Sequence, residues 1–489
     1  MIAEIMYFTA LAIMGLGLFG KSLDKVGALL AAGIAIPAGL TFFGLIQLVF
    51  AIAGLKLNAI SFWMLVLVLA AAAVTRMVIS QQDKGTLITA GTIVAFAIIA
   101  TAVFQILFNT AVLSFDSYDY VVLGSNLYRP DTELASRAMS GFLNNYPPLL
   151  WVAHSPARFF GAEFLALLHP VVFASTMGVC AGLVLFGLRK ISMPVWIRWG
   201  AALAPSLVLL TTPQMLHHAV YLMPNVLTGA LLAATVALLW IASERDAPAS
   251  LLLPAAICLA GVTLARQEGG LMAAVVMVAF ATAENVSWRA KTAFSLAVAI
   301  VATVWYATVF AVTGEASAEA ILTPMNAALQ FGCLWIAAAA SIATAWPPLR
   351  SCITAGAYAM PWVLAIAHLP YLILTPAHTL QSIGTFFINM FWAGSLWGIW
   401  WVALVPVMAL IFVSPDRIPR GSNIGLVLVT VFLLIDFLGV FRPAPYRLGD
   451  QDSGNRMLIH IFPLLWTYLI MRLVGSLSPE KLPRDTAPA

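Results

Sequence analysis

The chain has 489 residues, of which 62% are hydrophobic and only 9% charged, with a mean hydropathy of +0.97. Soluble domains carry charge on about a quarter of their residues, so this composition excludes a soluble globular protein and indicates a polytopic membrane protein. The formal charge of +4 comes from basic residues spread thinly between apolar segments, which excludes a nucleic-acid-binding patch and fits the positive-inside distribution instead.

Apolar runs close to the roughly 20 residues that cross a bilayer as a helix recur along the whole chain. No polar stretch is long enough for a soluble domain, so one all-α membrane domain is predicted over 1–489, with about 13–15 transmembrane helices. The first run carries Glu4 near its start and no basic region, which favours a retained helix over a signal peptide. The expected helices are 3–20, 27–54, 59–79, 87–113, 163–188, 199–213, 220–242, 250–265, 269–284, 292–312, 325–345, 352–372, 384–413, 423–440 and 456–475.

Basic residues in the connections predict how the chain crosses the membrane. If the connection that holds Lys21 and Lys25 is cytoplasmic, strict alternation places 16 of the 24 Lys and Arg residues inside. This predicts a multi-pass protein of a bacterial-type inner membrane, with its N-terminus outside and its tail, 476–489, in the cytoplasm. Every chemically unusual connection then lies on the extracytoplasmic side, namely 114–162, 211–218, 265–270, 314–319 and 442–456.

The first outer connection, 114–162, is the longest and opens with SFDSYDY. Asp116 and Asp119 are three residues apart, so on a helical turn both carboxylates project from one face towards one ligand. Partial desolvation would make either acid a better base, although both acids can also simply end a helix in headgroup water. Further along, partly helical spacing predicts short helices that lie along the membrane surface, whereas the two prolines of the YPPL stretch, Tyr146–Leu149, predict a rigid, non-helical backbone.

In LARQEGG, Arg266 and Glu268 interrupt an apolar stretch that would otherwise run from Leu251 to Ala283. Ionisable residues at such depth cost about 2.5–3.5 kcal/mol each on insertion scales, so they are usually retained for a ligand or a partner. The alternative is a short outer loop capped by a local Arg and Glu pair.

The last predicted helix begins with Arg456 and His460, four residues apart on one face. With Arg447 just upstream, this pattern suits a phosphate or pyrophosphate headgroup at the membrane surface, while simple snorkelling of arginine is the alternative. The adjacent His217 and His218 are weaker candidates, since such a pair in a loop is more often polar surface. The four cysteines give neither a metal-ligand spacing nor a disulfide framework.

Four features follow one another in chain order: the acids of the first outer loop, the YPPL stretch, an L-x-R-x-E-G segment at 264–269, and an N-R-M-L sequence at 455–458. Together they resemble the GT-C superfamily of integral-membrane glycosyltransferases, which includes protein O-mannosyltransferases, lipid A aminoarabinose transferases and mycobacterial arabinofuranosyltransferases. The resemblance covers residues 110–475. It implies transfer of a sugar, with inversion, from a polyprenyl-phosphate carrier to an extracytoplasmic glycan, lipid or protein.

The same resemblance implies roles for individual residues. Asp116 would be the general base that deprotonates the acceptor hydroxyl, and Asp119 a second acid that positions the acceptor or a metal. The stretch 146–149 would shape the loop beneath the carrier lipid. The donor phosphate-binding candidates are Arg266, Arg456 and Arg447, and the substrate-positioning candidates are Tyr146, Glu268, His217, His218 and His460.

The two acids depart from many relatives, in which the pair is adjacent or one residue apart. The spacing of three leaves open which Asp is the base and whether a divalent cation takes part. No clear cluster of metal ligands stands out beyond Asp116, Asp119, Asp450 and Asp452, so no cofactor and no required metal are expected. The expected partners are a polyprenyl-phosphate-linked sugar donor, a cell-envelope acceptor and membrane lipids.

A transporter or lipid flippase is the main alternative, and a polymerase of lipid-linked glycans is a second. Transporters usually carry functional charge near the bilayer midplane. Here the one clearly intramembrane acid is Asp436, whereas the unusual residues gather on one face, which favours chemistry at a surface. A polymerase would be expected to place its largest loop late in the chain, and a purely structural scaffold would leave Arg266 and Glu268 unexplained.

Overall fold

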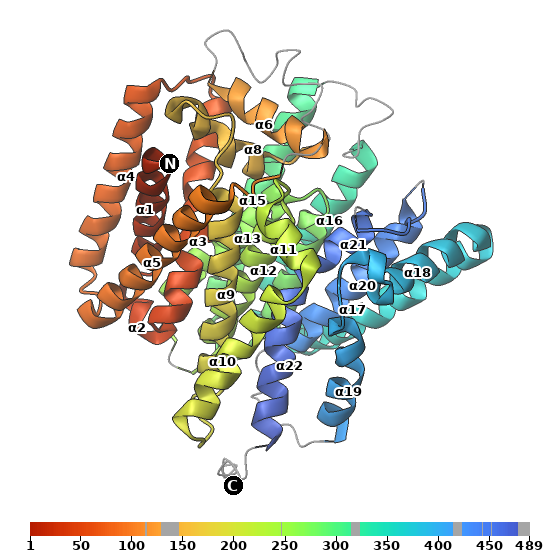
Figure 1. The fold of residues 1–489 in the computed structure, drawn as a ribbon. Coiled ribbons are helices and arrows are strands. Elements are labelled where there is room, and N and C mark those ends of the chain that lie inside the picture. Colours follow the sequence, from red (N-terminus) through yellow and green to blue (C-terminus); the bar gives the residue numbers. More distant parts are fainter. Residues whose placement is uncertain are drawn as a thin grey trace.

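The computed structural model describes residues 1–112, 115–128, 146–245, 247–313, 323–413, 423–442, 444–450 and 452–477. Within these residues the chain is all-helical, apart from one isolated bridge between Val112 and Tyr221, which confirms the predicted fold class (Figure 1). The α-helices are α1 (Ile2–Gly17), α2 (Leu23–Val26), α3 (Ala28–Ile52), α4 (Ala59–Ile79), α5 (Lys84–Phe108), α6 (Phe115–Leu127), α8 (Pro148–His154), α9 (Leu168–Gly187), α10 (Val195–Leu210), α11 (Pro213–Val220), α12 (Asn225–Ala242), α13 (Leu252–Ala265), α14 (Gly269–Ala281), α15 (Trp288–Thr313), α16 (Pro324–Ala343), α17 (Pro347–Leu374), α18 (Pro376–Phe391), α19 (Trp400–Val413), α20 (Ile424–Phe441), α21 (Ser453–Met457) and α22 (Phe462–Leu477). The 3-10 helices are η1 (Gly20–Ser22), η2 (Ser155–Phe160), η3 (Ala249–Leu251), η4 (Ala393–Ser395) and η6 (Leu458–His460).

Among the described residues, nine helices are long and apolar enough to cross a membrane, and the number rises to 12 if each of three sharply bent helix pairs is one span. The bends measure 91° between α1 and the η1–α2 segment, 74° between α10 and α11, and 48° between the α21–η6 segment and α22. The chain is therefore a multi-pass integral membrane protein. The count is lower than the expected 13–15 because three further apolar helices, α13, α14 and α19, are too short to be counted as spans.

Two predicted helices and one predicted turn differ from the structure. The expected helix 384–413 is wrong, because α18 and α19 are separated by a turn in which Leu396 and Gly398 both have φ of 63°. The expected helix 456–475 is bent just before Pro463, which has no backbone N–H to continue the ladder. The expected turn at 211–218 is mostly helix α11, which starts at Pro213, a residue suited to a first helical position.

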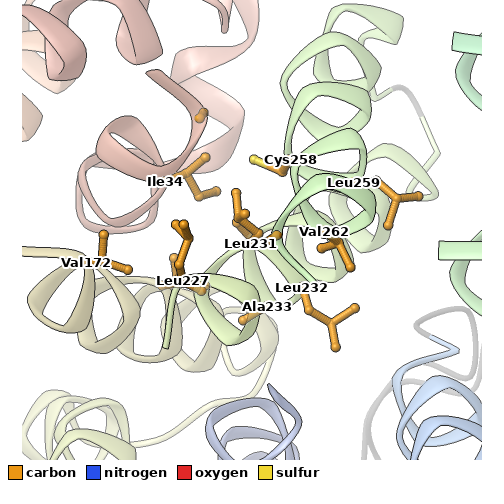
Figure 2. Packing of buried hydrophobic residues seen from close by; sticks show 14 of the residues in the cluster. Ile34, Val172, Leu227, Leu231, Leu232, Ala233, Cys258, Leu259 and Val262 are labelled. Atoms are coloured by element: carbon orange, nitrogen blue, oxygen red, sulfur yellow. The ribbon is translucent and has the colours of Figure 1, made fainter. Parts of the chain in front are cut away.

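Helix α12 is the centre of the bundle. All of its most apolar 18-residue window is buried, against 17% for α4, 22% for α5 and 11% for α17, which lie at the edges (Figure 1). Figure 2 shows Leu227 and Leu231 of α12 packed between Ile34 of α3, Val172 of α9 and Cys258 of α13. A helix that is apolar on every side can lie either among other helices or in lipid, and α12 lies among other helices whereas α4 and α5 are mostly exposed on the bundle surface.

Glycines let α3 pack against α9 at close range. A Cβ at Gly33 would lie 2.4 Å from the backbone nitrogen of Val179, and one at Gly182 would lie 2.5 Å from the Cβ of Leu30. Because these positions carry no side chain, the two backbones approach each other directly. Close approach of this kind is a main source of packing energy between membrane helices.

Contacts between connections define two ends of the bundle. At the Glu244 end, the Glu244 carboxylate pairs with Arg189 and Lys190, and the Ser250 hydroxyl donates a hydrogen bond to Ser22. Helix α12 runs from this end to Asn225, a length of 18 residues or roughly 27 Å at 1.5 Å per residue. The opposite end, where Asn225 lies, is here called the Arg266 end.

The Arg266 end brings together parts of four connections that the sequence places on one side. Tyr120, Tyr446 and His460 all lie within electrostatic range of Arg266, and Gln214 donates to the Asp450 carbonyl at 3.1 Å. The stretches 129–145 and 314–319, which belong to the same predicted side, lie outside the described residues.

Candidate functional site

Polar contacts fix the C-terminal end of α6 to the bundle. The Gln47 side-chain nitrogen, on α3, donates to the Tyr128 hydroxyl and to Ser155 Oγ, the latter at 3.3 Å. Lys56 Nζ donates to the Leu127 carbonyl at 3.3 Å. Burial raises the pKa of Tyr128 to about 12, so its hydroxyl stays neutral and serves as a hydrogen-bonding group. The helix that carries both predicted acids is thereby held in place.

Asp119 of α6 contacts Tyr146, the first residue of the YPPL stretch. The Tyr146 hydroxyl donates to Asp119 Oδ2 at 2.5 Å, and the Tyr146 carbonyl accepts from Trp151 Nε1 at 3.1 Å. A carboxylate engaged in this way has a fixed direction, and the hydrogen bond to its charged form is a strong one. Asp116 lies three residues earlier in α6, and its side chain is outside the described part of the structure.

The residues Arg266 to Glu268 join α13 to α14. Arg266 has an extended backbone, with φ of −136° and ψ of 152°, and its Nε lies 2.8 Å from Glu268 Oε1. The local ion pair that the sequence offered as an alternative is therefore present. However, its side chains are only 13% and 10% exposed, so the pair is largely, though not completely, shielded from solvent. A buried pair must keep both charges compensated.

Gly269 and Gly270, at the end of the ARQEGG segment, stand at positions where a side chain has no room. A Cβ at Gly269 would lie 2.0 Å from the Val262 carbonyl oxygen, and one at Gly270 would lie 2.5 Å from Gln330 Oε1. The Gly270 N–H donates to that Gln330 oxygen at 3.1 Å, and the Tyr306 hydroxyl donates to it at 2.8 Å. Two residues without side chains are needed for α14 to start this close to α13 and α16.

The predicted His218 and His460 are joined by Asn225, a residue that sequence reasoning missed. Asn225 Nδ2 lies 3.3 Å from His218 Nδ1, and Asn225 Oδ1 lies 3.4 Å from His460 Nε2. All three side chains are fully buried. His460 is within electrostatic range of Arg266, so this group borders the buried ion pair.

The two other predicted arginines differ in their surroundings. Arg456, in α21, is half-buried and within electrostatic range of His218. Arg447 is exposed, and its backbone N–H donates to Asp452 Oδ2 at 2.9 Å. Asp452 also caps α21 by accepting from the Gly454 N–H at 2.9 Å. Arg456 therefore joins the buried group, whereas no contact of the described residues brings the Arg447 side chain to it.

His217 lies beside this group. Its ring stacks on Tyr221 with centroids 4.9 Å apart and planes 12° apart, and Asp450 is within electrostatic range. Within the described part of the chain, no group of three or more His, Cys, Asp and Glu side chains is placed to hold a metal ion.

Two further histidines, also missed from the sequence, extend the group. His154 Nδ1 accepts from the Leu165 N–H at 3.2 Å, and His169 Nε2 donates to the Met223 carbonyl at 2.9 Å. Their rings stack with centroids 5.8 Å apart, and His169 is within electrostatic range of His218. A lone histidine in an apolar run gives no spacing signal, so only the fold brings them together.

Tyr120, the residue after Asp119 on α6, is near both Tyr146 and Arg266. Its ring packs edge-on against Tyr146, with centroids 4.9 Å apart, and it is within electrostatic range of Arg266. Through Tyr120, the acid-bearing helix α6 is itself within electrostatic range of the Arg266–Glu268 pair. Comparison with protein-family models, with curated proteins and with solved structures gives no match for this chain.

Proposed function

We propose that the protein is a membrane glycosyltransferase that moves a sugar, with inversion, from a polyprenyl-phosphate carrier to a cell-envelope glycan, lipid or protein. The observation that supports this most is that Tyr120 of α6 packs against Tyr146, the partner of Asp119, and is within electrostatic range of Arg266, which pairs with Glu268. Displacement of a sugar phosphate needs a base for the nucleophile and a cation for the leaving group. Helix α6, which carries both candidate acids, and Arg266 lie at the same end of the bundle.

In the proposed reaction, a carboxylate of α6 takes the proton from the acceptor hydroxyl. Asp116 is the first candidate for this base, and Asp119, fixed by Tyr146, orients the acceptor. The acceptor oxygen attacks the anomeric carbon, the bond from that carbon to the phosphate oxygen breaks, and the phosphate leaves with the electron pair. Arg266 and Arg456 balance its charge, and Glu268 fixes the direction of Arg266. The isoprenoid chain binds to the apolar surface.

The proposal also assigns each end of the bundle to one side of the membrane. The Arg266 end faces the outside of a bacterial-type inner membrane, and the Glu244 end faces the cytoplasm, as the distribution of Lys and Arg favours. A reporter fused at residue 130 should therefore score as extracytoplasmic. A cytoplasmic score would contradict the sidedness and the proposed mechanism together.

The residues of α6 provide the functional test. Asp116→Asn should abolish glycosyl transfer while the protein stays inserted and folded, since removal of a general base typically costs about 10²- to 10⁴-fold in rate. Asp119→Asn tests the second acid in the same assay. Asp24→Asn, an exposed acid of α2 near the Glu244 end, is the matched control and should transfer normally. Transfer near the wild-type rate by Asp116→Asn would remove Asp116 as the base.

One observation favours a transporter as a second candidate. Asp436 of α20 lies with its Oδ2 3.5 Å from His368 Nε2 of α17, and the side chains are 7% and 11% exposed. Ionisable pairs inside membrane helices often mark ion pathways. Asp436→Asn separates the two functions, because it should leave sugar transfer intact in a glycosyltransferase and should abolish substrate movement in a proton-coupled transporter.

A further inference from the structure

Asn225 makes two hydrogen bonds whose directions are fixed by its chemistry. An amide nitrogen only donates and an amide oxygen only accepts. Since Asn225 Nδ2 faces His218 Nδ1 at 3.3 Å, that ring nitrogen must be the acceptor. Since Asn225 Oδ1 faces His460 Nε2 at 3.4 Å, that ring nitrogen must carry a proton and donate. One buried side chain therefore determines the proton position on two rings.

The ring nitrogen that does not face Asn225 is then a hydrogen-bond donor in His218 and an acceptor in His460. In its neutral form, His218 carries its one proton on Nε2, so this edge is an N–H donor. Neutral His460 also carries its proton on Nε2, which is used by Asn225, so its Nδ1 is a bare acceptor. Among the described residues, neither His218 Nε2 nor His460 Nδ1 has a hydrogen-bond partner, although both atoms are buried. A buried polar atom of this kind is an expected position for a ligand or water contact.

The charged neighbours of these rings favour the neutral form. Arg456 lies within electrostatic range of His218, and Arg266 lies within electrostatic range of His460. The two guanidinium groups repel a further positive charge on either imidazole, and burial acts in the same direction. The rings are therefore hydrogen-bonding groups, not additional cations.

We propose that Asn225 is a positioning residue, which fixes an N–H donor on His218 and a bare nitrogen on His460 for hydroxyl groups of the donor sugar. This inference rests on the proposed function. A hydroxyl both accepts and donates, so it matches this pair, whereas a phosphate oxygen only accepts and an ammonium only donates. Arg266, which is within electrostatic range of His460, binds the phosphate. His218, Asn225 and His460 recognise the sugar attached to it.

The first test needs no substrate. In protein labelled with ¹⁵N-histidine, the ring-nitrogen shifts should show both His218 and His460 neutral and protonated on Nε2. Asn225→Asp replaces the amide donor with an acceptor, so His218 should move its proton to Nδ1 or become doubly protonated, while His460 stays protonated on Nε2. An unchanged His218 in Asn225→Asp, or a wild-type His218 protonated on Nδ1, overturns the inference. His378→Gln, which changes a half-buried histidine of α18, serves as the control.

The second test uses the polyprenyl-phosphate sugar that the wild-type protein turns over, together with its monodeoxy analogues. At least one analogue should lose about 10- to 100-fold in kcat/KM, because the missing hydroxyl leaves a buried ring nitrogen unpaired. Asn225→Asp should lose most of this discrimination, and His378→Gln should keep it. Equal turnover of all analogues by the wild type overturns the inference while the proposed function stands. A complete absence of transfer overturns the proposed function itself, and the ¹⁵N spectra still decide what Asn225 does to the rings.

Discussion

The two ends of the bundle each contain an arginine and a glutamate in contact, at nearly the same distance. Arg266 and Glu268 are 2.8 Å apart and 13% and 10% exposed, whereas Arg189 and Glu244 are 2.6 Å apart and 35% and 19% exposed. Exposed pairs contribute little because water and salt screen them, while a buried charge without its partner is costly. The two ion pairs therefore differ in burial and not in the distance between the Arg nitrogen and the Glu oxygen.

The hydrogen bonds around the two ion pairs also differ. At the Glu244 end, arginines donate to nearby backbone carbonyls, as Arg198 does to Ile191 at 3.0 Å, and these contacts close local turns. At the Arg266 end, contacts join residues far apart in the chain, such as His460 and Asn225, which are 235 positions apart. The Glu244 end also has a contact between distant residues, since Ser250 donates to Ser22 from 228 positions away, but Ser250 is half-buried, whereas Asn225, His218 and His460 are all fully buried.

The largest expected difference between the ends comes from removing each glutamate. Glu268→Gln leaves the Arg266 charge buried without its counter-charge, so the free energy of unfolding in detergent should fall by about 3–5 kcal/mol. Chemical denaturation of the purified protein measures this. A fall of less than about 1 kcal/mol would mean that the pair behaves like a surface pair.

Tyr146→Phe removes the hydroxyl that donates to Asp119. A hydrogen bond to a charged group is worth about 1.5–3 kcal/mol, so sugar transfer should fall by about 10- to 100-fold if Asp119 orients the acceptor. Tyr358→Phe, an exposed tyrosine of α17, is the matched control and should transfer at the wild-type rate. Equal transfer rates for the two variants would show that the position of Asp119 does not affect the reaction.

Gly269→Ala tests the close approach that shapes the ARQEGG segment. Its Cβ would lie 2.0 Å from the Val262 carbonyl oxygen, so the two helices must move apart, and stability should fall by about 1–3 kcal/mol. Gly332→Ala of α16 is the control, because a Cβ there meets nothing within 4 Å. A melting temperature that is unchanged in Gly269→Ala would contradict this packing.

The smallest effect is expected at the other end. Glu244→Gln removes the partner of Arg189 and Lys190, yet all three side chains keep access to water. The change in unfolding free energy should stay below about 1 kcal/mol and should shrink further in high salt. A loss as large as that of Glu268→Gln would remove the contrast between the ends.

Much of the fold follows from the sequence because apolar runs of sufficient length must be helices in a membrane. Hydropathy could not show the break between α18 and α19, since Leu396 and Trp397 are apolar but the backbone there turns through positive φ. It also could not show α11, where a proline starts a helix and not a turn.

The candidate site was only partly accessible from the sequence. Charges in an apolar context identified Arg266, Glu268 and Arg456, because each is costly to bury without a reason. Asn225 and His169 gave no such signal, since a single neutral polar residue at the start of an apolar helix is common. Their role depends on partners from distant parts of the chain, which only the packing of α9, α11, α12 and η6 brings together.

The proposed glycosyl transfer is tested most directly by incubating the purified protein in membranes with a panel of radiolabelled polyprenyl-phosphate sugars. The wild-type protein should hydrolyse or transfer at least one sugar, and Asp116→Asn should not act on it, while Asp24→Asn matches the wild type. Failure to turn over any donor would contradict the glycosyltransferase and favour the transporter.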